Sequence, residues 1–183
     1  MVEAPRVAGR QRGSAPPWRE PASTAPIRWG GYRGRYVAAL ALVLGGAILV
    51  QTGSVYLPQV MLVGMGAHLA GWWILPGRGW RRVVVSLPSL TTVMLILNGA
   101  AAMVFLVIPL AGWLWLRHRP LRAYTVLVLP AITAYILTLN FAQYGFGALV
   151  LLISGAVVIG SAWLARSIAV ALPVRSDSPA SID

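Results

Sequence analysis

The sequence contains no cysteine and no lysine, and it has only four acidic residues against fifteen arginines in 183 residues. The absence of cysteine excludes disulfide bonds and thiolate metal sites. Charged residues make up only 10% of the chain, and the mean hydropathy is +0.74. These values exclude an ordinary soluble domain. The exclusive use of arginine, with abundant alanine, glycine, valine and proline, indicates a GC-rich coding sequence and hence a high-GC bacterium.

Charged side chains are also missing from every long apolar run of the sequence. Proton-coupled pumps and many cation transporters require carboxylates inside the membrane, so this absence argues against both classes. The chain has no metalloprotease pattern, no glycine-rich phosphate loop and no nucleophile elbow. We therefore expect a protein that is not an enzyme and that uses no cofactor and no metal.

What the sequence does contain is a series of apolar runs of membrane-spanning length. A helix rises about 1.5 Å per residue, so roughly 20 apolar residues cross a hydrocarbon core of about 30 Å. We expect an all-α integral membrane helical bundle over residues 36–166, built as three consecutive hairpins. The six expected transmembrane helices cover about residues 36–54, 58–75, 83–98, 100–116, 123–140 and 146–165.

The number of spans depends on the uncharged stretch Val83–Leu116. Its thirty-four residues are too many for one straight span and slightly too few for two ideal ones. Asn98-Gly99 lies at the centre of this stretch and is a strong turn dipeptide, because both residues tolerate positive φ. A turn there gives two short helices and six spans in total, whereas one continuous helix gives five.

The distribution of arginine favours six spans. Basic residues in short loops collect on the cytoplasmic side of a bacterial membrane. Six spans place all fifteen arginines and both termini inside, whereas five spans move five of the arginines outside. We therefore expect a multi-pass protein of the bacterial cytoplasmic (cell) membrane with both termini in the cytoplasm.

Tryptophans indicate the same side of the membrane. Trp72, Trp113 and Trp163 each follow two small residues and precede an arginine by a few positions. An indole at the level of the lipid headgroups, with an arginine just beyond it, is typical of an interfacial anchor. In the six-span arrangement, all three tryptophans lie at the cytoplasmic ends of helices.

The two ends of the chain are expected to be cytoplasmic tails. Residues 1–35 carry seven arginines among proline, alanine, glycine and serine, and they have too few apolar residues to offset the entropy of ordering. This tail either binds anionic lipid headgroups through its arginines or only holds the N-terminus inside. Its aromatic residues are too sparse for nucleic-acid binding. Residues 167–183 form a second, shorter tail.

Two polar side chains within the apolar runs, His68 and Asn98, are candidate functional residues. His68 lies about 15 Å into its span, and Gly64 and Gly71 on the same helix face allow another helix to approach. It either takes up protons or a ligand, or it is a neutral imidazole in an interhelical hydrogen bond. The partners available for that bond are a backbone carbonyl or the side chains of Thr91, Thr92 and Ser154. Asn98 either ends a turn or forms an interhelical hydrogen bond within a single central helix.

These features predict a non-enzymatic membrane protein of one of two classes. The first is a structural or accessory subunit that binds a membrane-protein partner or a second copy of itself. The alternative is a small permease or transporter subunit for a neutral or apolar solute. An interior packed uniformly with apolar side chains favours the first class, whereas a polar track shared by several helices favours the second.

Overall fold

The structure is a computed structural model that describes residues 31–53, 57–77, 79–141 and 146–171. This part of the chain is helical and contains no β-strand, which confirms the all-α class. Most of the two expected tails, residues 1–30 and 172–183, lies outside the described residues.

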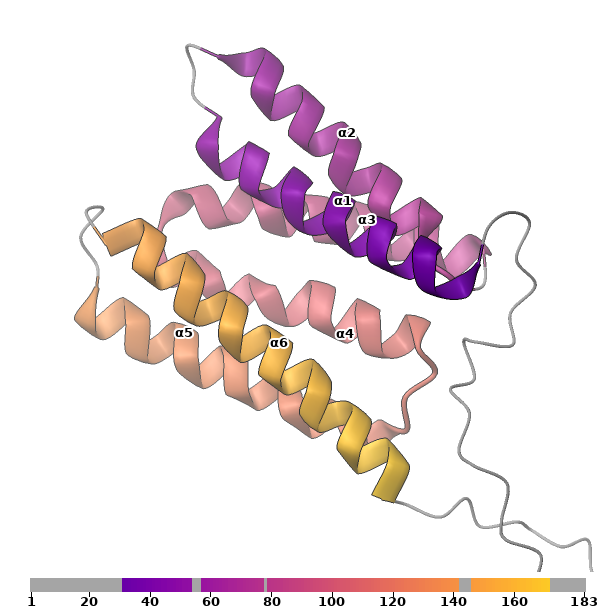
Figure 1. The fold of residues 1–183 in the computed structure, drawn as a ribbon. Coiled ribbons are helices and arrows are strands. Elements are labelled where there is room, and N and C mark those ends of the chain that lie inside the picture. The colour runs from indigo at the N-terminus through magenta and orange to yellow at the C-terminus, as the bar shows by residue number, and fades with distance from the viewer. Residues whose placement is uncertain (1–30, 54–56, 78, 142–145, 172–183) are drawn as a thin grey trace, which may run out of the picture.

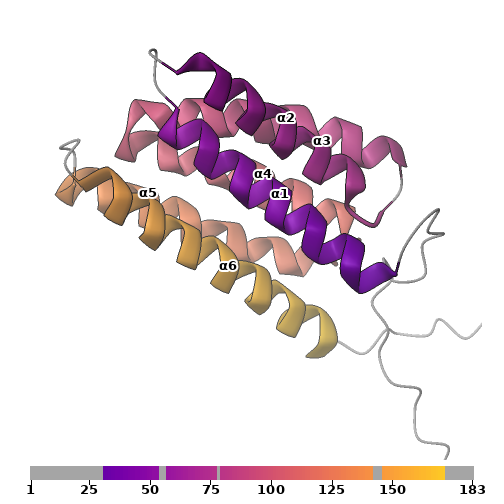
Figure 2. The same ribbon diagram turned by 45° about the horizontal axis from the view of Figure 1, so that its top comes forward.

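Helical segments follow one another along the chain with short connections. In order they are α1 (Tyr32–Thr52), α2 (Pro58–Ile74), α3 (Gly79–Leu95) with the 3₁₀ segment η2 (Ile96–Asn98), η3 (Ala100–Leu106) with α4 (Val107–Leu116), η4 (Leu121–Leu127) with α5 (Val128–Asn140), and α6 (Gly147–Ala171). Figures 1 and 2 show α3 and α4 lying between the α1–α2 pair and the α5–α6 pair. Both ends of the described chain lie at the same end of the bundle, on the right in Figure 1.

Two helix ends differ from the sequence-based boundaries. The first helix begins at Tyr32, so Arg33 and Arg35 belong to α1 and not to the tail over residues 1–35. The last helix continues to Ala171, past the expected end at residue 165, and includes Arg166. The physical reason is the same at both ends. Arginine is a good helix former, and its long side chain can reach the interface from within a helix, so one arginine does not end a span.

The central stretch turns at Gly99. The φ of this residue is 97°, which a glycine adopts without strain, and it separates η2 from η3. The two helical segments on either side run antiparallel. Thr92 hydrogen-bonds the carbonyl of Phe105 near the turn, at 3.4 Å, and Arg81 hydrogen-bonds the carbonyl of Trp115 at the far end, at 3.2 Å. The stretch therefore forms two packed helices, as the hairpin alternative requires.

Prolines explain why 3₁₀ segments precede α4 and α5. Pro109 and Pro130 lie in the first turn of each α-helix, directly after η3 and η4. A proline lacks the N–H that would bond the carbonyl four residues earlier, and its ring crowds that carbonyl. The preceding turns therefore tighten to 3₁₀ geometry. For Pro109 the affected carbonyl belongs to Phe105, and this oxygen accepts the Thr92 hydroxyl from α3 instead.

Glycines bring α1 and α2 into direct backbone contact. A β-carbon added at Gly64 would lie 2.8 Å from the carbonyl oxygen of Gly46, and one added at Gly71 would lie 2.8 Å from the carbonyl oxygen of Ala39. Both glycines share the helix face of His68, so the structure confirms the close approach expected there. The close contact allows the His68 side chain to reach the backbone of α1.

The outer surface and the lengths of the helices indicate a membrane protein. Four helices are long and apolar enough to cross a membrane: Tyr32–Thr52, Gly79–Asn98, Leu121–Asn140 and Gly147–Ala171. The segment Ala100–Leu116 is apolar but shorter, and α2 has 17 residues. Large apolar side chains cover the outside, such as Leu152 at 71% exposure and Leu139 at 66%. Exposed apolar surface of this extent is typical of contact with a membrane or with a protein partner.

Candidate functional site

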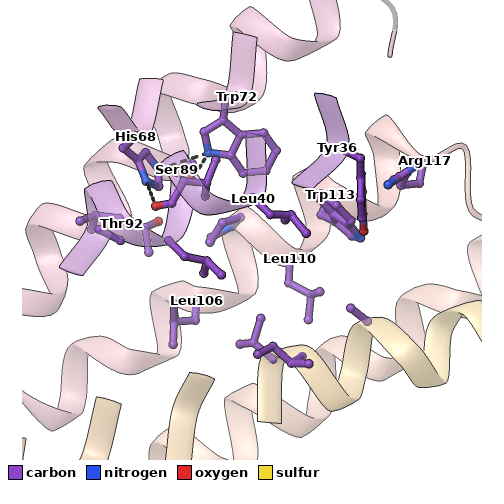
Figure 3. A pocket seen from close by; sticks show the side chains of 18 of the residues that line it. Tyr36, Leu40, His68, Trp72, Ser89, Thr92, Leu106, Leu110, Trp113 and Arg117 are labelled. Atoms are coloured by element: carbon purple, nitrogen blue, oxygen red, sulfur yellow. Dashed lines mark hydrogen bonds between the residues drawn. The ribbon is translucent and has the colours of Figure 1, made fainter. Parts of the chain in front are cut away.

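A cavity of about 690 Å³ lies between α1, α4 and α6, with α2 and α3 contributing to its inner wall. Figure 3 shows this cavity with the side chains that line it. Its volume falls within the range of about 300–1,000 Å³ that is usual for small-molecule sites. This cavity is the candidate functional site.

One face of α1 forms a long wall of the cavity. Tyr32, Tyr36, Leu40 and Leu44 follow one another at intervals of four residues, and Ala47 continues the row. Residues four apart lie on the same face of a helix, so the row is continuous. Tyr32 was not expected at the site, because residues 1–35 were predicted to form a tail. The periodic spacing of the two tyrosines with Leu40 and Leu44 is the signal that could have placed Tyr32 in the first helix.

The facing walls come from α4 and α6 and are mostly apolar. Leu106 and Leu110 line the cavity from the η3–α4 segment, and Val158 and Ala162 line it from α6. Each pair is again four residues apart, so each helix presents one apolar face to the cavity.

His68 lies in the inner wall and joins three helices. Its exposure is 2%, its Nδ1 lies 2.9 Å from the carbonyl oxygen of Val43 on α1, and its Nε2 lies 2.9 Å from the hydroxyl of Ser89 on α3. The indole Nε1–H of Trp72 donates to the same hydroxyl at 2.9 Å. Figure 3 shows the contacts among His68, Trp72 and Ser89 as dashed lines.

The proton positions follow from the chemistry of the partners. A backbone carbonyl only accepts, so Nδ1 of His68 must carry the proton that is donated to Val43. Trp72 only donates, and its indole N–H lies within hydrogen-bond distance of both the Ser89 hydroxyl, at 2.9 Å, and His68 Nε2, at 3.2 Å. Nε2 therefore carries no proton and accepts, and the Ser89 hydroxyl gives its own proton to it. The result is a directed chain from Trp72 through Ser89 and His68 to Val43, in which the imidazole is neutral and every polar group is satisfied. Chains of this kind strengthen each of their hydrogen bonds.

Two features of this site differ from what the sequence predicts. The backbone carbonyl expected as one alternative is that of Val43, but the side-chain partner of His68 is Ser89. Thr91 and Thr92 instead bond the carbonyls of Leu87 and Pro88 in their own helix, and Thr92 also contacts that of Phe105. Trp72 is 3% exposed, so it is a buried donor and not an interfacial anchor. Both differences arise because the glycine contacts between α1 and α2 set the rotation of α2, which sequence spacing alone does not define.

At the other side of the cavity, Arg117 is held between aromatic rings. Its guanidinium carbon lies 4.5 Å from the ring centroid of Tyr36 and 4.7 Å from that of Trp113, and it donates a hydrogen bond to the hydroxyl of Tyr32. Arg117 is only 2% exposed. Cation–π contacts strengthen when the cation is removed from water, so the rings compensate part of the cost of burying this charge. Arg119 and Arg166 also line the cavity.

These arginines belong to what we call the basic end of the bundle: the start of α1, the α2–α3 and α4–η4 connections, and the last turns of α6. Arg35 donates to the carbonyl of Ile74 at 2.9 Å, and Arg82 donates to that of Leu75 at 3.1 Å. The carbonyls at a helix C-terminus carry the negative end of the helix dipole and attract cations. The described residues include no aspartate or glutamate, so the helix ends take the place of carboxylates at the basic end.

Asn98, the second candidate residue, does not take part in the cavity. It is exposed, and its side-chain amide donates to the carbonyl of Leu95 at 2.9 Å, one turn earlier in the chain. It therefore completes the turn before Gly99. Within the described part of the chain, no group of three metal-ligating side chains lies close enough together to hold a metal ion.

Comparisons of the chain with protein-family models, with curated proteins and with solved structures found no match. The fold and the cavity therefore indicate a class alone: an all-helical membrane protein, with four helices long and apolar enough to cross a bilayer and a largely apolar cleft between its helices.

The hydrogen-bond chain predicts the effect of changing His68. His68→Leu should destabilise the protein by about 1–2 kcal/mol, because the Ser89 hydroxyl loses its acceptor in a buried site. His68→Gln retains a donor and an acceptor at similar size and should melt within a degree or two of the unchanged protein. The measurement is thermal unfolding in detergent, together with complementation of a gene deletion. A stable Gln variant that fails to complement would assign His68 a direct role in ligand or proton binding.

Proposed function

We propose that this chain is a non-enzymatic, six-span protein of a bacterial cytoplasmic membrane that binds an apolar or amphiphilic molecule taken from the bilayer. It acts as a small permease or transporter subunit, the second of the two classes expected from the sequence, with an amphiphilic molecule added to the neutral or apolar solute expected there. The observation that carries the proposal is the cavity of about 690 Å³, which has apolar walls on α1, α4 and α6.

The cavity supports a binding role over a purely structural one. The space is a cleft that opens to the outside of the bundle, because Leu44, Ile159 and Trp163 along it are exposed, so a molecule from the bilayer can enter it. Here Leu40, Leu110 and Ala162 line open space from three different helices. The polar chain at His68 spans several helices, but its groups satisfy one another. The inner wall of the cavity therefore suits the apolar part of a ligand, which makes no hydrogen bonds.

The basic end supports the proposed orientation. The described arginines gather at one end of the bundle, where α1 starts and α6 ends. Positive charge remains on the cytoplasmic side during insertion, so both termini lie in the cytoplasm. In this orientation α1 and α6 are the first and last spans along the chain. The four remaining spans are α2, α3–η2, η3–α4 and η4–α5. The shorter ones cross with local thinning of the bilayer.

Filling the cavity should prevent binding. Ala162→Phe places a large ring in the cavity, whereas Ala156→Phe places the same ring on an exposed face of the same helix. We expect the unchanged protein and the Ala156→Phe variant to retain one added phosphatidylcholine molecule per chain in native mass spectrometry. Ala162→Phe should retain at least fivefold less. Equal retention by the two variants, with both folded, would show that lipid binds elsewhere and would reject the proposed function.

A further inference from the structure

The side chains that line the cavity change from charged to apolar along its length. At the basic end it is lined by Arg117, Arg119 and Arg166, and away from that end it is lined mainly by aliphatic side chains. A ligand that matches both parts carries negative charge at one end and an apolar chain at the other. A neutral apolar solute would leave the arginines unused, and a small anion would leave the apolar walls unused.

The length of the apolar part corresponds to one leaflet of a bilayer. Along α1 the wall runs from Tyr36 to Ala47. Eleven residues of helix span about 16 Å, and half of a hydrocarbon core is about 15 Å. His68 and Ser89 line the inner wall, where their hydrogen bonds are already satisfied by Val43 and Trp72. The part of a ligand that lies against the inner wall therefore needs no polar group.

The charged part is suited to a phosphate group. Arg117 is fixed by Tyr36 and Trp113, so it contributes a positive charge whose position is set before any ligand binds. Arg119 is half-buried and Arg166 is exposed, so both can reach a headgroup at the membrane surface. Guanidinium groups bind phosphate oxygens in a bidentate manner.

We propose that the cavity binds one anionic phospholipid of the cytoplasmic leaflet. Its phosphate headgroup lies at Arg119 and Arg166, with the charge of Arg117 behind it, and an acyl chain lies along the apolar walls of α1, α4 and α6. This inference rests on the proposed function and names the chemical class of the ligand.

The test uses the full chain, purified in detergent, and a pair of lipids with identical acyl chains. Native mass spectrometry measures the retention of phosphatidylglycerol, which is anionic, and of phosphatidylcholine, which is net neutral. The protein should prefer phosphatidylglycerol by about tenfold or more. Inorganic phosphate, added as a competitor, should not displace the lipid, because the apolar walls contribute most of the contact.

A matched pair of double variants separates the site from general surface charge. Arg119→Gln with Arg166→Gln should weaken phosphatidylglycerol retention by about fivefold for each arginine removed, as expected for about 1 kcal/mol per basic residue. Arg33→Gln with Arg122→Gln removes the same net charge from exposed positions outside the cavity and should change retention by less than twofold. Arg117 is left unchanged in both, because it is buried among aromatic rings.

The outcomes distinguish the inference from the proposed function. Equal retention of the two lipids, or equal weakening in both double variants, would overturn the anionic headgroup while leaving an apolar binding site in place. Displacement by inorganic phosphate would show that the site binds free phosphate and not a lipid. Retention of neither lipid by the unchanged, folded protein would overturn the proposed function itself.

Discussion

Gly64→Leu should abolish the α1–α2 pair and with it most of the folded protein. A β-carbon at this position would lie 2.8 Å from the carbonyl oxygen of Gly46 and 2.8 Å from the amide nitrogen of Val50. Both are backbone atoms of α1, so no side-chain rotation can relieve the clash, and the two helices must separate. Separation also breaks the hydrogen bond from His68 to Val43. We expect a loss of about 3 kcal/mol or more, at the upper end of the usual cost of overpacking.

Gly66→Leu is the control for this prediction. Gly66 lies two residues further along the same helix, it is exposed, and a β-carbon there would meet nothing within 4 Å. This variant should extract and melt like the unchanged protein, because leucine is the better helix former. The measurements are the yield of monodisperse protein in detergent and its melting temperature. Similar stability of the two leucine variants would contradict the close packing of α1 on α2.

The number and orientation of the spans should be visible in cysteine labelling on the two sides of the membrane. In the six-span arrangement, the turn at Asn98 faces outward and Leu121, at the basic end, faces the cytoplasm. The chain has no cysteine, so Asn98→Cys and Leu121→Cys each introduce a single thiol without background. Both positions are exposed, Leu121 at 87%. In intact cells, a membrane-impermeant maleimide should label Asn98→Cys to completion and leave Leu121→Cys unlabelled.

Permeabilised cells complete the topology experiment. Both thiols should react once the reagent has access to the cytoplasm. If the central stretch were a single span, Leu121→Cys would label in intact cells and Asn98→Cys would remain protected in the bilayer even after permeabilisation. If six spans were inserted with the opposite orientation, Asn98→Cys would react only after permeabilisation. The labelling patterns of the three arrangements are all different, so the pair of variants decides among them.

Part of the candidate site could be predicted from the sequence. His68 was singled out because it is the one ionisable side chain within an apolar run, and the structure places it in the wall of the cavity. The close helix approach at Gly64 and Gly71 was also predicted and is confirmed. The contribution of Tyr36 and Arg117 was not predicted, because these residues lie 81 positions apart in the chain and meet only when α1 packs beside α4.

The sequence by itself determined the class of protein and the site of the central turn. Hydropathy and the clustering of arginine are sums over local composition, and the turn at Gly99 depends on the dihedral freedom of a single residue, so neither requires knowledge of distant contacts. The rotation of each helix about its own axis was decided only by the tertiary structure. That rotation makes Trp72 a buried hydrogen-bond donor, selects Ser89 as the partner of His68 and leaves a cavity between α1, α4 and α6. The physical reason is that rotation follows from the contacts each helix makes with its neighbours. Here those are the backbone contacts at Gly46 and Gly64, which bring together residues far apart in the chain.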